Sequence, residues 1–162
     1  RFGNRLYLPA GPLREPVSRL RSVSMRVANG EPETGELGMT SVPTVFYSLS
    51  RPERRAAADQ FRSGPVHAVA GIGNPERFFF SLRDMGLNVL PHPFPDHHGF
   101  LPGELEFGDD RPVIMTEKDA VKCEPFAIAR CWVLAVEARP EVALGEQVLK
   151  RLKEIIRGQE AA

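Results

Sequence analysis

The amino-acid sequence predicts an α/β fold, in which a mostly parallel sheet is flanked by helices. From residue 65 onward, apolar runs of strand length alternate with segments of helical periodicity. This alternation is typical of parallel sheets, because a helical crossover returns the chain to the same end of the sheet. Two earlier strand-like runs, at 23–29 and 42–49, could pair with each other. We therefore divide the chain into residues 1–64 and residues 65–162.

Residues 1–64 contain few regular patterns. The first 22 residues are rich in Pro, Gly and Arg, which predicts an irregular segment with a helical turn near 15–20. Residues 30–43 are rich in Glu, Gly and Pro, and they predict a loop between the two strands. Residues 51–64 fit either a helix or a charged linker.

Residues 65–162 have clearer element boundaries. The first apolar run, 65–72, ends in a Gly-x-Gly turn. A helix then begins with Asn74 as its N-cap and Pro75 in the first helical position, and Gly86 closes it. The remaining elements are strands at 88–94, 112–116 and 131–138, a short helix at 103–107, a helix at 117–122 that begins at Thr116, and a final helix at 141–157.

The final helix carries an apolar stripe along one side. Apolar side chains at this spacing usually form a face that packs against a hydrophobic core. We therefore expect this helix to pack on the core rather than to anchor the chain in a membrane. The stripe consists of Val148, Leu149, Leu152, Ile155 and Ile156.

The composition is that of an ordinary soluble globular protein, with 162 residues of which 42% are hydrophobic and 26% charged. The formal net charge is zero, so no global field attracts nucleic acid, and we expect no nucleic-acid partner. Residues 1–26 nevertheless contain six arginines and a single acid, Glu15. This basic stretch could meet phosphates or an anionic membrane surface, or it could be a solvated face balanced by acids downstream.

The two cysteines, Cys123 and Cys131, match no disulfide framework and no familiar zinc-site spacing, so we expect buried thiols in a reducing compartment. No apolar run approaches the roughly 20 residues that a membrane span needs, and no signal peptide is recognisable. The chain begins at Arg1 without a lead-in, which suggests that the start of a longer protein is missing.

Polar clusters follow three of the predicted strands, at 71–77, 94–98 and 116–118. The carboxyl ends of parallel strands meet at one edge of a sheet, and ligands of such folds bind there. We therefore expect the three clusters to come together at a functional edge of the sheet.

The most distinctive cluster lies in the stretch 91–100, where three histidines, one aspartate and three prolines fall within ten residues. Histidine exchanges protons near neutral pH, and a neighbouring carboxylate can orient it. The prolines disfavour a helix or a central strand, so the stretch predicts a stiff loop. Asp96, His97 and His98 are candidates for acid–base chemistry, or the histidines could simply be exposed. No metal site is expected, because no second cluster has ligand spacing.

Each of the other two clusters could bind a ligand or could have a purely structural role. Residues 71–74 could hold an anion at a helix N-terminus, or they could be only a capped helix start. Their spacing matches neither a dinucleotide fingerprint nor a P-loop, and Glu76 would repel a phosphate. Lys118 could reach a phosphate, or it could form a solvent-facing ion pair beside a capping box.

Four separated segments of the chain, taken in order, carry a family resemblance. They are Leu-Pro-Ala-Gly-Pro-Leu-Arg-Glu at 8–15, Ala-Gly-Ile-Gly-Asn-Pro-Glu-Arg-Phe-Phe at 70–79, Phe-Pro-Asp-His-His at 94–98 and Met-Thr-Glu-Lys-Asp-Ala-Val-Lys-Cys at 115–123. Together they resemble the C-terminal half of the tetraacyldisaccharide 4'-kinase family, the lipid A pathway kinases of Gram-negative bacteria. The resemblance extends from residue 1 to about residue 157.

The resemblance implies an enzyme that transfers the γ-phosphoryl group of ATP, with Mg²⁺, to the 4'-hydroxyl of a tetraacyldisaccharide 1-phosphate, the lipid A precursor. Family members act peripherally at the cytoplasmic face of the inner membrane. They join a P-loop domain to a smaller Rossmann-like C-terminal domain through a two-stranded linker, which strands at 23–29 and 42–49 would suit. Residues 1–64 would then be a remnant of the N-terminal domain plus this linker, and residues 65–162 the C-terminal α/β domain.

One motif of the family does not occur in this sequence. It contains no Gly-x-x-x-x-Gly-Lys-Ser/Thr, and the metal-binding acids and catalytic aspartate of the family would lie before residue 1. Phosphoryl transfer depends on positioning and on neutralising charge around the phosphates. We therefore expect ATP and Mg²⁺ to be bound mainly by the missing half, and the chain alone to have no kinase activity.

The resemblance also suggests roles for single residues. The family's histidine partner of the catalytic aspartate matches His97, with Asp96 beside it and His98 as the alternative. Arg14 and Arg19 are expected to contact the anionic head group of the lipid, because an Arg fork suits phosphate geometry. The residues expected to face the nucleotide or the domain interface are Asn74, Glu76, Arg77 and Lys118.

A second class of function also fits the residues. The chain could be a standalone α/β module that binds an anionic ligand through residues 1–26 and the polar edge of the sheet. The sequence directly upstream separates the two classes, since an in-frame P-loop motif favours the kinase and a start codon favours the module.

Overall fold

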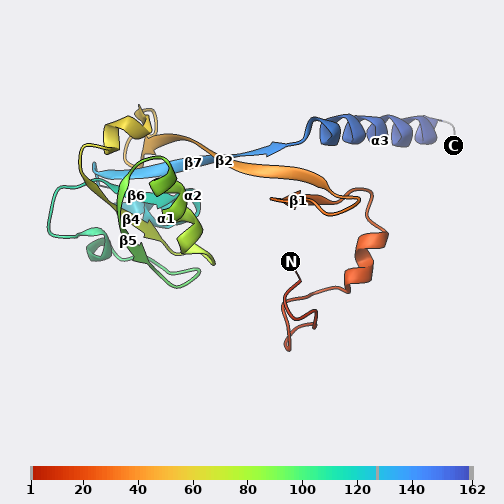
Figure 1. The fold of residues 1–162 in the computed structure, drawn as a ribbon, viewed down its shortest axis with the longest axis horizontal. Coiled ribbons are helices and arrows are strands. Elements are labelled where there is room, and N and C mark those ends of the chain that lie inside the picture. Colours follow the sequence, from red (N-terminus) through yellow and green to blue (C-terminus); the bar gives the residue numbers. More distant parts are fainter. Residues whose placement is uncertain (1, 127, 161–162) are drawn as a thin grey trace. The chain divides into compact units, whose positions relative to one another are not determined.

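The computed structural model describes residues 2–126 and 128–160, and the chain forms two compact units (Figure 1). Unit 2 comprises Val42–Glu137, and unit 1 comprises the described residues up to Ser41 and from Ala138 onward. Both boundaries fall inside long strands, β2 (Leu37–Ser48) and β7 (Cys131–Pro140). These boundaries differ from the expected division at residue 64, which stays a prediction about domains.

The predicted, mostly parallel sheet is confirmed. Its four parallel strands follow the order β7-β6-β4-β5, with residues 67–69 of β4 in register with residues 113–115 of β6. At the other side of β7 lies β2, which pairs antiparallel with the two-residue strand β3. The bounds of the strands within unit 2 are Arg55–Ala56 for β3, Pro65–Ala70 for β4, Asn88–Pro93 for β5 and Val113–Thr116 for β6.

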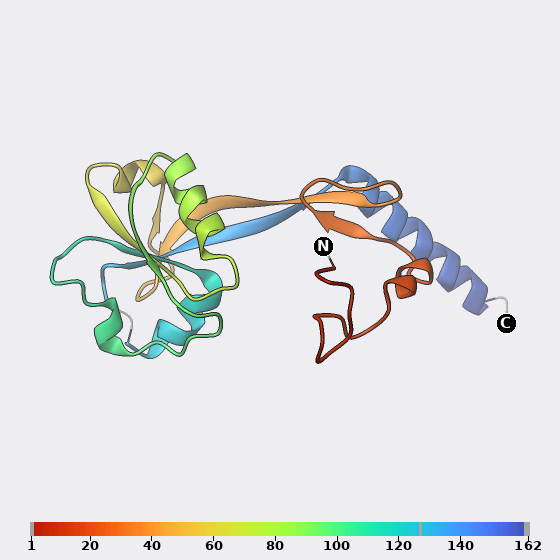
Figure 2. The same ribbon diagram turned by 60° about the horizontal axis from the view of Figure 1, so that its bottom comes forward.

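Each face of the sheet in unit 2 is covered by one helix (Figure 2). Ala68 and Ala70 of β4 lie in one apolar cluster with Phe79 of α1 (Pro75–Asp84). Val69, between them, lies in the other cluster with residues of α2 (Glu117–Cys123). A strand buried on both faces reads as a continuous apolar run, which is why the pattern at 65–72 is not alternating.

The predicted helix starts are confirmed. The Asn74 side chain accepts a hydrogen bond from the Arg77 N–H at 3.2 Å, and Pro75 opens α1. Gly86 follows the end of that helix with a φ of 84°, in the left-handed region where glycine is preferred. The α2 helix begins in the same way, because Thr116 Oγ1 accepts the Asp119 N–H at 3.2 Å.

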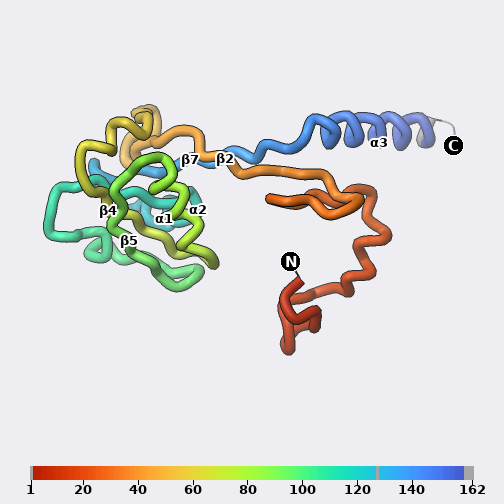
Figure 3. The backbone as a smooth tube through the Cα atoms, in the orientation of Figure 1, coloured from red at the N-terminus to blue at the C-terminus, as the bar shows by residue number. Residues whose placement is uncertain are grey.

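The expected pairing of the two early strands is confirmed, but it uses an earlier stretch of the second strand than 42–49. The first short strand, β1 (Val27–Asn29), is parallel to residues 37–39 of β2, a stretch expected to be a loop. The rest of β2 runs beside β7, as Figure 3 also shows, and Thr44 Oγ1 donates to Ala135 O at 3.3 Å. The glycines and prolines of 30–43 indicated a loop, but ladder hydrogen bonds to β7 outweigh that local preference.

Short 3₁₀ helices occupy several expected helical or irregular segments. The turn expected near 15–20 is η1 (Val17–Arg21), and the short helix expected at 103–107 is η3 (Pro102–Leu105). The segment 51–64 is neither a continuous helix nor a free linker, because η2 (Ala58–Phe61) buries Phe61 in the core. A last turn, η4 (Glu124–Phe126), extends α2.

The helix α3 (Val142–Glu160) forms as predicted, but its apolar stripe is not buried among the described residues. Val148 is half-buried, and 59% of Leu149 and 54% of Ile156 are exposed. The expectation that this stripe packs on the core is therefore contradicted for the part of the chain that the structure describes. A helical stripe predicts that a face needs cover, but the pattern does not identify what covers it.

The remaining expectations about the chain concern cysteines and membrane spans. Cys123 and Cys131 are both buried free thiols, as predicted. Burial, the largest cause, raises the pKa of Cys123 to about 12, so this thiol is inert near neutral pH. Among residues 2–126 and 128–160, no helix combines the length and the apolar character that a membrane span requires.

Candidate functional site

The three polar clusters meet at the carboxyl edge of the parallel strands, as predicted. A Cβ built on Gly71 would lie 3.2 Å from Asp119 Oδ1 and 3.4 Å from His98 Cβ. A Cβ on Gly73 would lie 3.6 Å from Asp96 Oδ2. The turn after β4 therefore approaches the histidine loop and the start of α2, and Gly71 leaves the space that this approach needs.

Asp119 joins two of these clusters from inside the protein. Its side chain is fully buried and accepts hydrogen bonds from Gly71 N at 3.0 Å and from Thr116 Oγ1 at 2.7 Å. Lys122 Nζ lies 3.0 Å from its other oxygen. A buried carboxylate needs such partners, since an unpaired buried charge is strongly unfavourable. Asp119 therefore fixes the turn after β4 to the beginning of α2.

Asp96 joins the histidine loop to α2 at the surface. Its Oδ1 accepts hydrogen bonds from Lys118 Nζ and from the His97 N–H, both at 3.1 Å. Its Oδ2 lies 3.6 Å from Nε2 of the His97 ring. The hydrogen bond from Lys118, the largest cause, lowers the pKa of Asp96, so the carboxylate stays ionised at neutral pH. Lys118 thus forms the ion pair that the sequence left as an alternative.

The two adjacent histidines have opposite environments. His97 has a φ of 62°, and 77% of its side chain is exposed. His98 has 24% of its side chain exposed, packs against the rings of both Phe94 and Phe100, and has its Nε2 3.0 Å from Glu104 Oε2. His97 is therefore accessible to a group outside this chain, whereas His98 is an internal packing residue.

The first turn of α1 holds three other predicted site residues at the same edge. Asn74 is exposed, but its side-chain oxygen is used to cap the helix through Arg77 N. Glu76 and Arg77 are exposed on that turn. These residues lie beside Gly73 and hence near Asp96, so the grouping expected from the sequence is present in unit 2.

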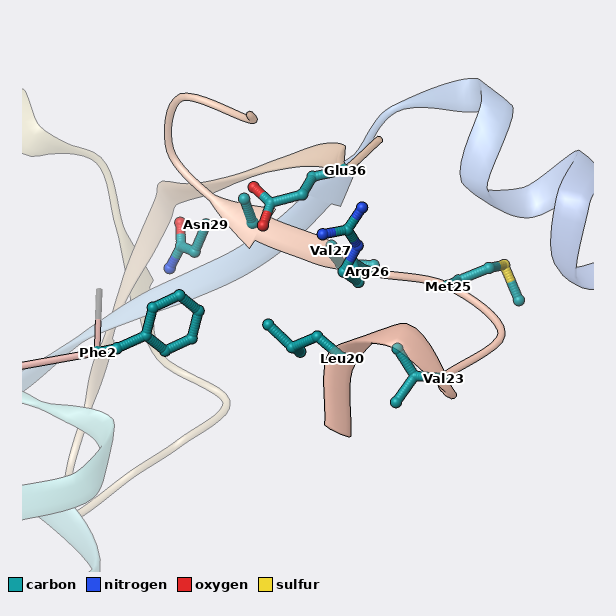
Figure 4. Close-up of a pocket in the computed structure, with 9 residues that line it drawn as sticks. Phe2, Leu20, Val23, Met25, Arg26, Val27, Asn29 and Glu36 are labelled. Carbon is teal, nitrogen blue, oxygen red and sulfur yellow. The ribbon is translucent and has the colours of Figure 1, made fainter. Parts of the chain in front are cut away.

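Arg14 and Arg19 belong to unit 1, whereas the polar edge is built from residues of unit 2. Both are exposed, and Arg19 forms an ion pair with Glu15 at 3.2 Å. Unit 1 has its own open cavity of about 450 Å³, to which neither arginine contributes (Figure 4). It is lined by Phe2, Leu20, Val23, Met25, Arg26, Val27, Ala28, Asn29 and Glu36.

A partly buried histidine pair that the sequence patterns did not reveal lies on β4 and β5. His67 is 5% exposed, and its Nδ1 lies 2.9 Å from Nε2 of His92. Its Nε2 lies 3.2 Å from both oxygens of Asp109, which also accepts from Arg111. The Phe107 ring stacks on both imidazoles. Two histidines 25 residues apart carry no local signal, and only the pairing of β4 with β5 brings them together.

The histidine pair predicts a stability that falls in mild acid. Burial, the largest cause, and then His67 lower the pKa of His92, so the unfolded chain binds a proton that the folded chain does not. The free energy of unfolding should therefore fall as pH drops below about 6.5. Urea unfolding, followed by the fluorescence of the single tryptophan, Trp132, should show a lower midpoint at about pH 5.5 than at about pH 7.5.

The control for this prediction is His92→Gln, which keeps an N–H donor for His67 but does not titrate. Its midpoint should depend less on pH over the same interval. The lowered pKa values of Asp96, Glu104 and Asp109 affect stability only in more acidic solution, below about pH 5, and do not disturb the comparison. An equal pH dependence in both proteins would contradict the assignment to His92.

The described residues contain no group of three or more His, Cys, Asp or Glu side chains that could hold a metal ion. Asp96 is paired with Lys118, and Asp119 is paired with Lys122, so both carboxylates at the edge already have cationic partners. The donors present here do not fit a Mg²⁺ site.

Comparisons with known proteins identify relatives that are longer than this chain. The tetraacyldisaccharide 4'-kinase of Alkalilimnicola ehrlichii is 54% identical over 153 residues, which cover 91% of this chain and 44% of the relative. That of an Azoarcus species is 49% identical over 161 residues, covering 94% and 47%. The chain therefore spans about half the length of the curated relatives that it matches.

A solved structure supports the fold. The crystal structure of LpxK from Aquifex aeolicus in complex with ATP matches with a TM-score of 0.65 at 24% identity, covering 90% of this chain and 47% of that one. A family model described as tetraacyldisaccharide-1-P 4'-kinase matches residues 1–153. That match covers nearly the whole sequence, and the chain is thus a member of the tetraacyldisaccharide-1-P 4'-kinase family.

Proposed function

We propose that this chain supplies the histidine loop of a lipid A 4'-kinase, whose active site is completed by the half of the fold that the chain does not span. The reaction is transfer of the γ-phosphoryl group of ATP to the 4'-hydroxyl of a tetraacyldisaccharide 1-phosphate. The proposal is carried by one observation, the exposed His97 that projects from the polar edge of a chain belonging to this family.

His97 is proposed to orient an aspartate from the other half of the kinase and to tune its basicity toward the acceptor hydroxyl. A group with this role must reach a partner outside the chain, and its exposure of 77% allows this. Asp96 accepts a hydrogen bond from the His97 N–H and lies close to the His97 ring. His98 is a weaker candidate, because Glu104, Phe94 and Phe100 hold it inside the loop.

The phosphate-binding part of the reaction is assigned to the other half of the kinase. The sequence contains no P-loop motif, and its described residues do not form a metal site. Mg²⁺ is therefore assigned to that other half. Glu76 and Arg77 are proposed to face the nucleotide or the domain interface, with Lys118 holding Asp96.

The basic segment at residues 1–26 is proposed to contact the lipid substrate. Arg14 is the better candidate for its 1-phosphate, because Arg19 is already paired with Glu15. An acylated substrate and an arginine-rich segment both favour peripheral binding at the cytoplasmic face of the inner membrane. The standalone anion-binding module has no specific observation in its favour, since Lys118 is ion-paired and Asn74 caps a helix.

The proposal is tested by joining the chain to the N-terminal half of the Alkalilimnicola ehrlichii relative. We expect this joined kinase to transfer phosphate from ATP to the tetraacyldisaccharide 1-phosphate, and the 162-residue chain alone not to do so. The matched control is the joined kinase with its P-loop lysine replaced by alanine. Activity of the chain alone, or a well-folded joined kinase without transfer, would contradict the proposal.

A further inference from the structure

The backbone of His97 has an unusual conformation for a residue with a side chain. Its φ of 62° lies in the left-handed region, which histidine adopts much less readily than glycine. Asp96 Oδ1 accepts the His97 N–H, and the His98 N–H donates to Pro95 O, both at 3.1 Å. A conformation of this kind persists only where the surrounding structure holds it.

The side chain of His98 points into the loop and fixes this turn through ring contacts and a hydrogen bond. Its ring centroid lies 4.8 Å from that of Phe94 and 5.0 Å from that of Phe100. Its Nε2 lies 3.1 Å from Oε1 and 3.0 Å from Oε2 of Glu104. The ring contacts fix where the imidazole packs, and the hydrogen bond to the carboxylate fixes the direction in which its Nε2 points. Glu104 therefore determines how His98, and with it the peptide bond after His97, is oriented.

Glu104 is itself fixed in place. Its Oε2 accepts the Leu101 N–H at 2.7 Å at the start of η3, so the carboxylate cannot simply follow His98 if the loop shifts. These two hydrogen bonds lower the pKa of Glu104, with that from His98 as the largest cause, and the group stays ionised at neutral pH. Glu106, an exposed glutamate two residues later, makes neither contact among the described residues.

We propose that Glu104 is a positioning residue for His97, which it acts on through His98. The fixed Glu104 carboxylate accepts a hydrogen bond from His98 and keeps that ring inside the loop. This keeps His97 in the left-handed conformation that turns its imidazole outward. The inference rests on the proposed function, in which His97 meets an aspartate from the other half of the kinase. Glu104 is not a catalytic residue, because its effect passes through His98.

The conformational claim is tested on the 162-residue chain, without any measurement of activity. The amide signals and the amide–α-proton coupling of His97 are measured by NMR in the wild type, Glu104→Ala and the matched control Glu106→Ala. We expect Glu104→Ala to shift or broaden the His97 signals and to change the coupling, while Glu106→Ala leaves them as in the wild type. Unchanged His97 signals in Glu104→Ala would overturn the inference.

A pair of His98 variants keeps the test decisive if Glu104→Ala fails to fold. His98→Leu keeps an apolar side chain against Phe94 and Phe100 but cannot donate to Glu104, and His98→Gln keeps an N–H donor. We expect His98→Leu to perturb the His97 signals and His98→Gln to preserve them. Equal signals in the two variants would show that the hydrogen bond to Glu104 does not position His97.

The consequence for catalysis is measured in the joined kinase. We expect Glu104→Ala and His98→Leu each to lower kcat about 10- to 100-fold, with the KM for ATP within about twofold, because misplacement of a reacting group by ~1 Å can cost that much. His98→Gln should lose less than about threefold. The double variant Glu104→Ala/His98→Leu should lose no more than one single variant, since both remove one interaction.

Failure of the positioning role and failure of the proposed kinase function would give different results. Independent, multiplying losses in the double variant, or an unchanged kcat in Glu104→Ala, would overturn the positioning role while leaving the kinase assignment intact. A joined kinase that is inactive without any substitution would overturn the proposed function, and the NMR comparison would still decide whether Glu104 positions His97.

Discussion

Replacing His97 by alanine is expected to lower kcat of the joined kinase by about 10²- to 10⁴-fold, the range over which a positioned acid–base group contributes. The imidazole is exposed and beside Asp96, so its removal deprives the partner aspartate of orientation without leaving a cavity. The KM for ATP should change little, because His97 is not proposed to bind the nucleotide. Initial rates of phosphate transfer at saturating disaccharide measure the effect.

Two further variants separate the imidazole from the backbone. Asparagine also tolerates the left-handed region, so His97→Asn should keep the loop conformation and still lose activity. His98→Ala should lower thermal stability as well as kcat, because it removes the ring that packs against Phe94 and Phe100 and holds the turn. Full activity of both His97→Ala and His97→Asn would show that the histidine loop has no part in catalysis.

The features that the sequence predicted well are those decided locally or by topology. Asn74, Pro75 and Gly86 define α1 because capping and the left-handed end of a helix depend on only a few neighbouring residues. The meeting of the three polar clusters followed from the parallel sheet alone, since carboxyl ends of parallel strands share an edge.

The features that could not be predicted depend on contacts between distant segments. The long partner of β2 is β7, about 90 residues later, as the hydrogen bond from Thr44 to Ala135 shows. The residues of β2 contain nothing that specifies this partner, because strand propensity reports only a pleated, half-buried environment. The same limit applies to α3, whose apolar stripe indicates a face to be covered but not its cover.

The choice between His97 and His98 is neither decided by the local sequence nor dependent on very distant segments. Adjacent residues of the same type share their local pattern, so the sequence leaves both open as candidates. Their difference comes from Glu104, Phe94 and Phe100, which enclose His98 and leave His97 outside. Only the loop geometry, with its left-handed residue at position 97, separates an internal histidine from an accessible one.

Replacing Asp119 by alanine is expected to destabilise unit 2 by about 3 kcal/mol, because removal of one partner of a buried ion pair typically costs ~3–5 kcal/mol and Lys122 keeps some access to water. The substitution also leaves Gly71 N and Thr116 Oγ1 without their buried acceptor. Trp132, buried in the core of unit 2, reports the transition, so its fluorescence in a urea titration measures the change.

Two controls assign this loss to the buried carboxylate rather than to removal of an acid. Asp59, whose side chain is 79% exposed and paired with Arg62, should shift the urea midpoint very little when replaced by alanine, since surface ion pairs contribute at most about 1 kcal/mol. Asp119→Asn keeps one acceptor oxygen but places an N–H₂ among donors, so its midpoint should lie between those of wild type and Asp119→Ala. If Asp119→Ala unfolds at the same urea concentration as Asp59→Ala, the carboxylate does not hold the turn after β4. The polar edge would then have to be fixed by the Asp96–Lys118 pair at the surface, which is too exposed to supply several kcal/mol.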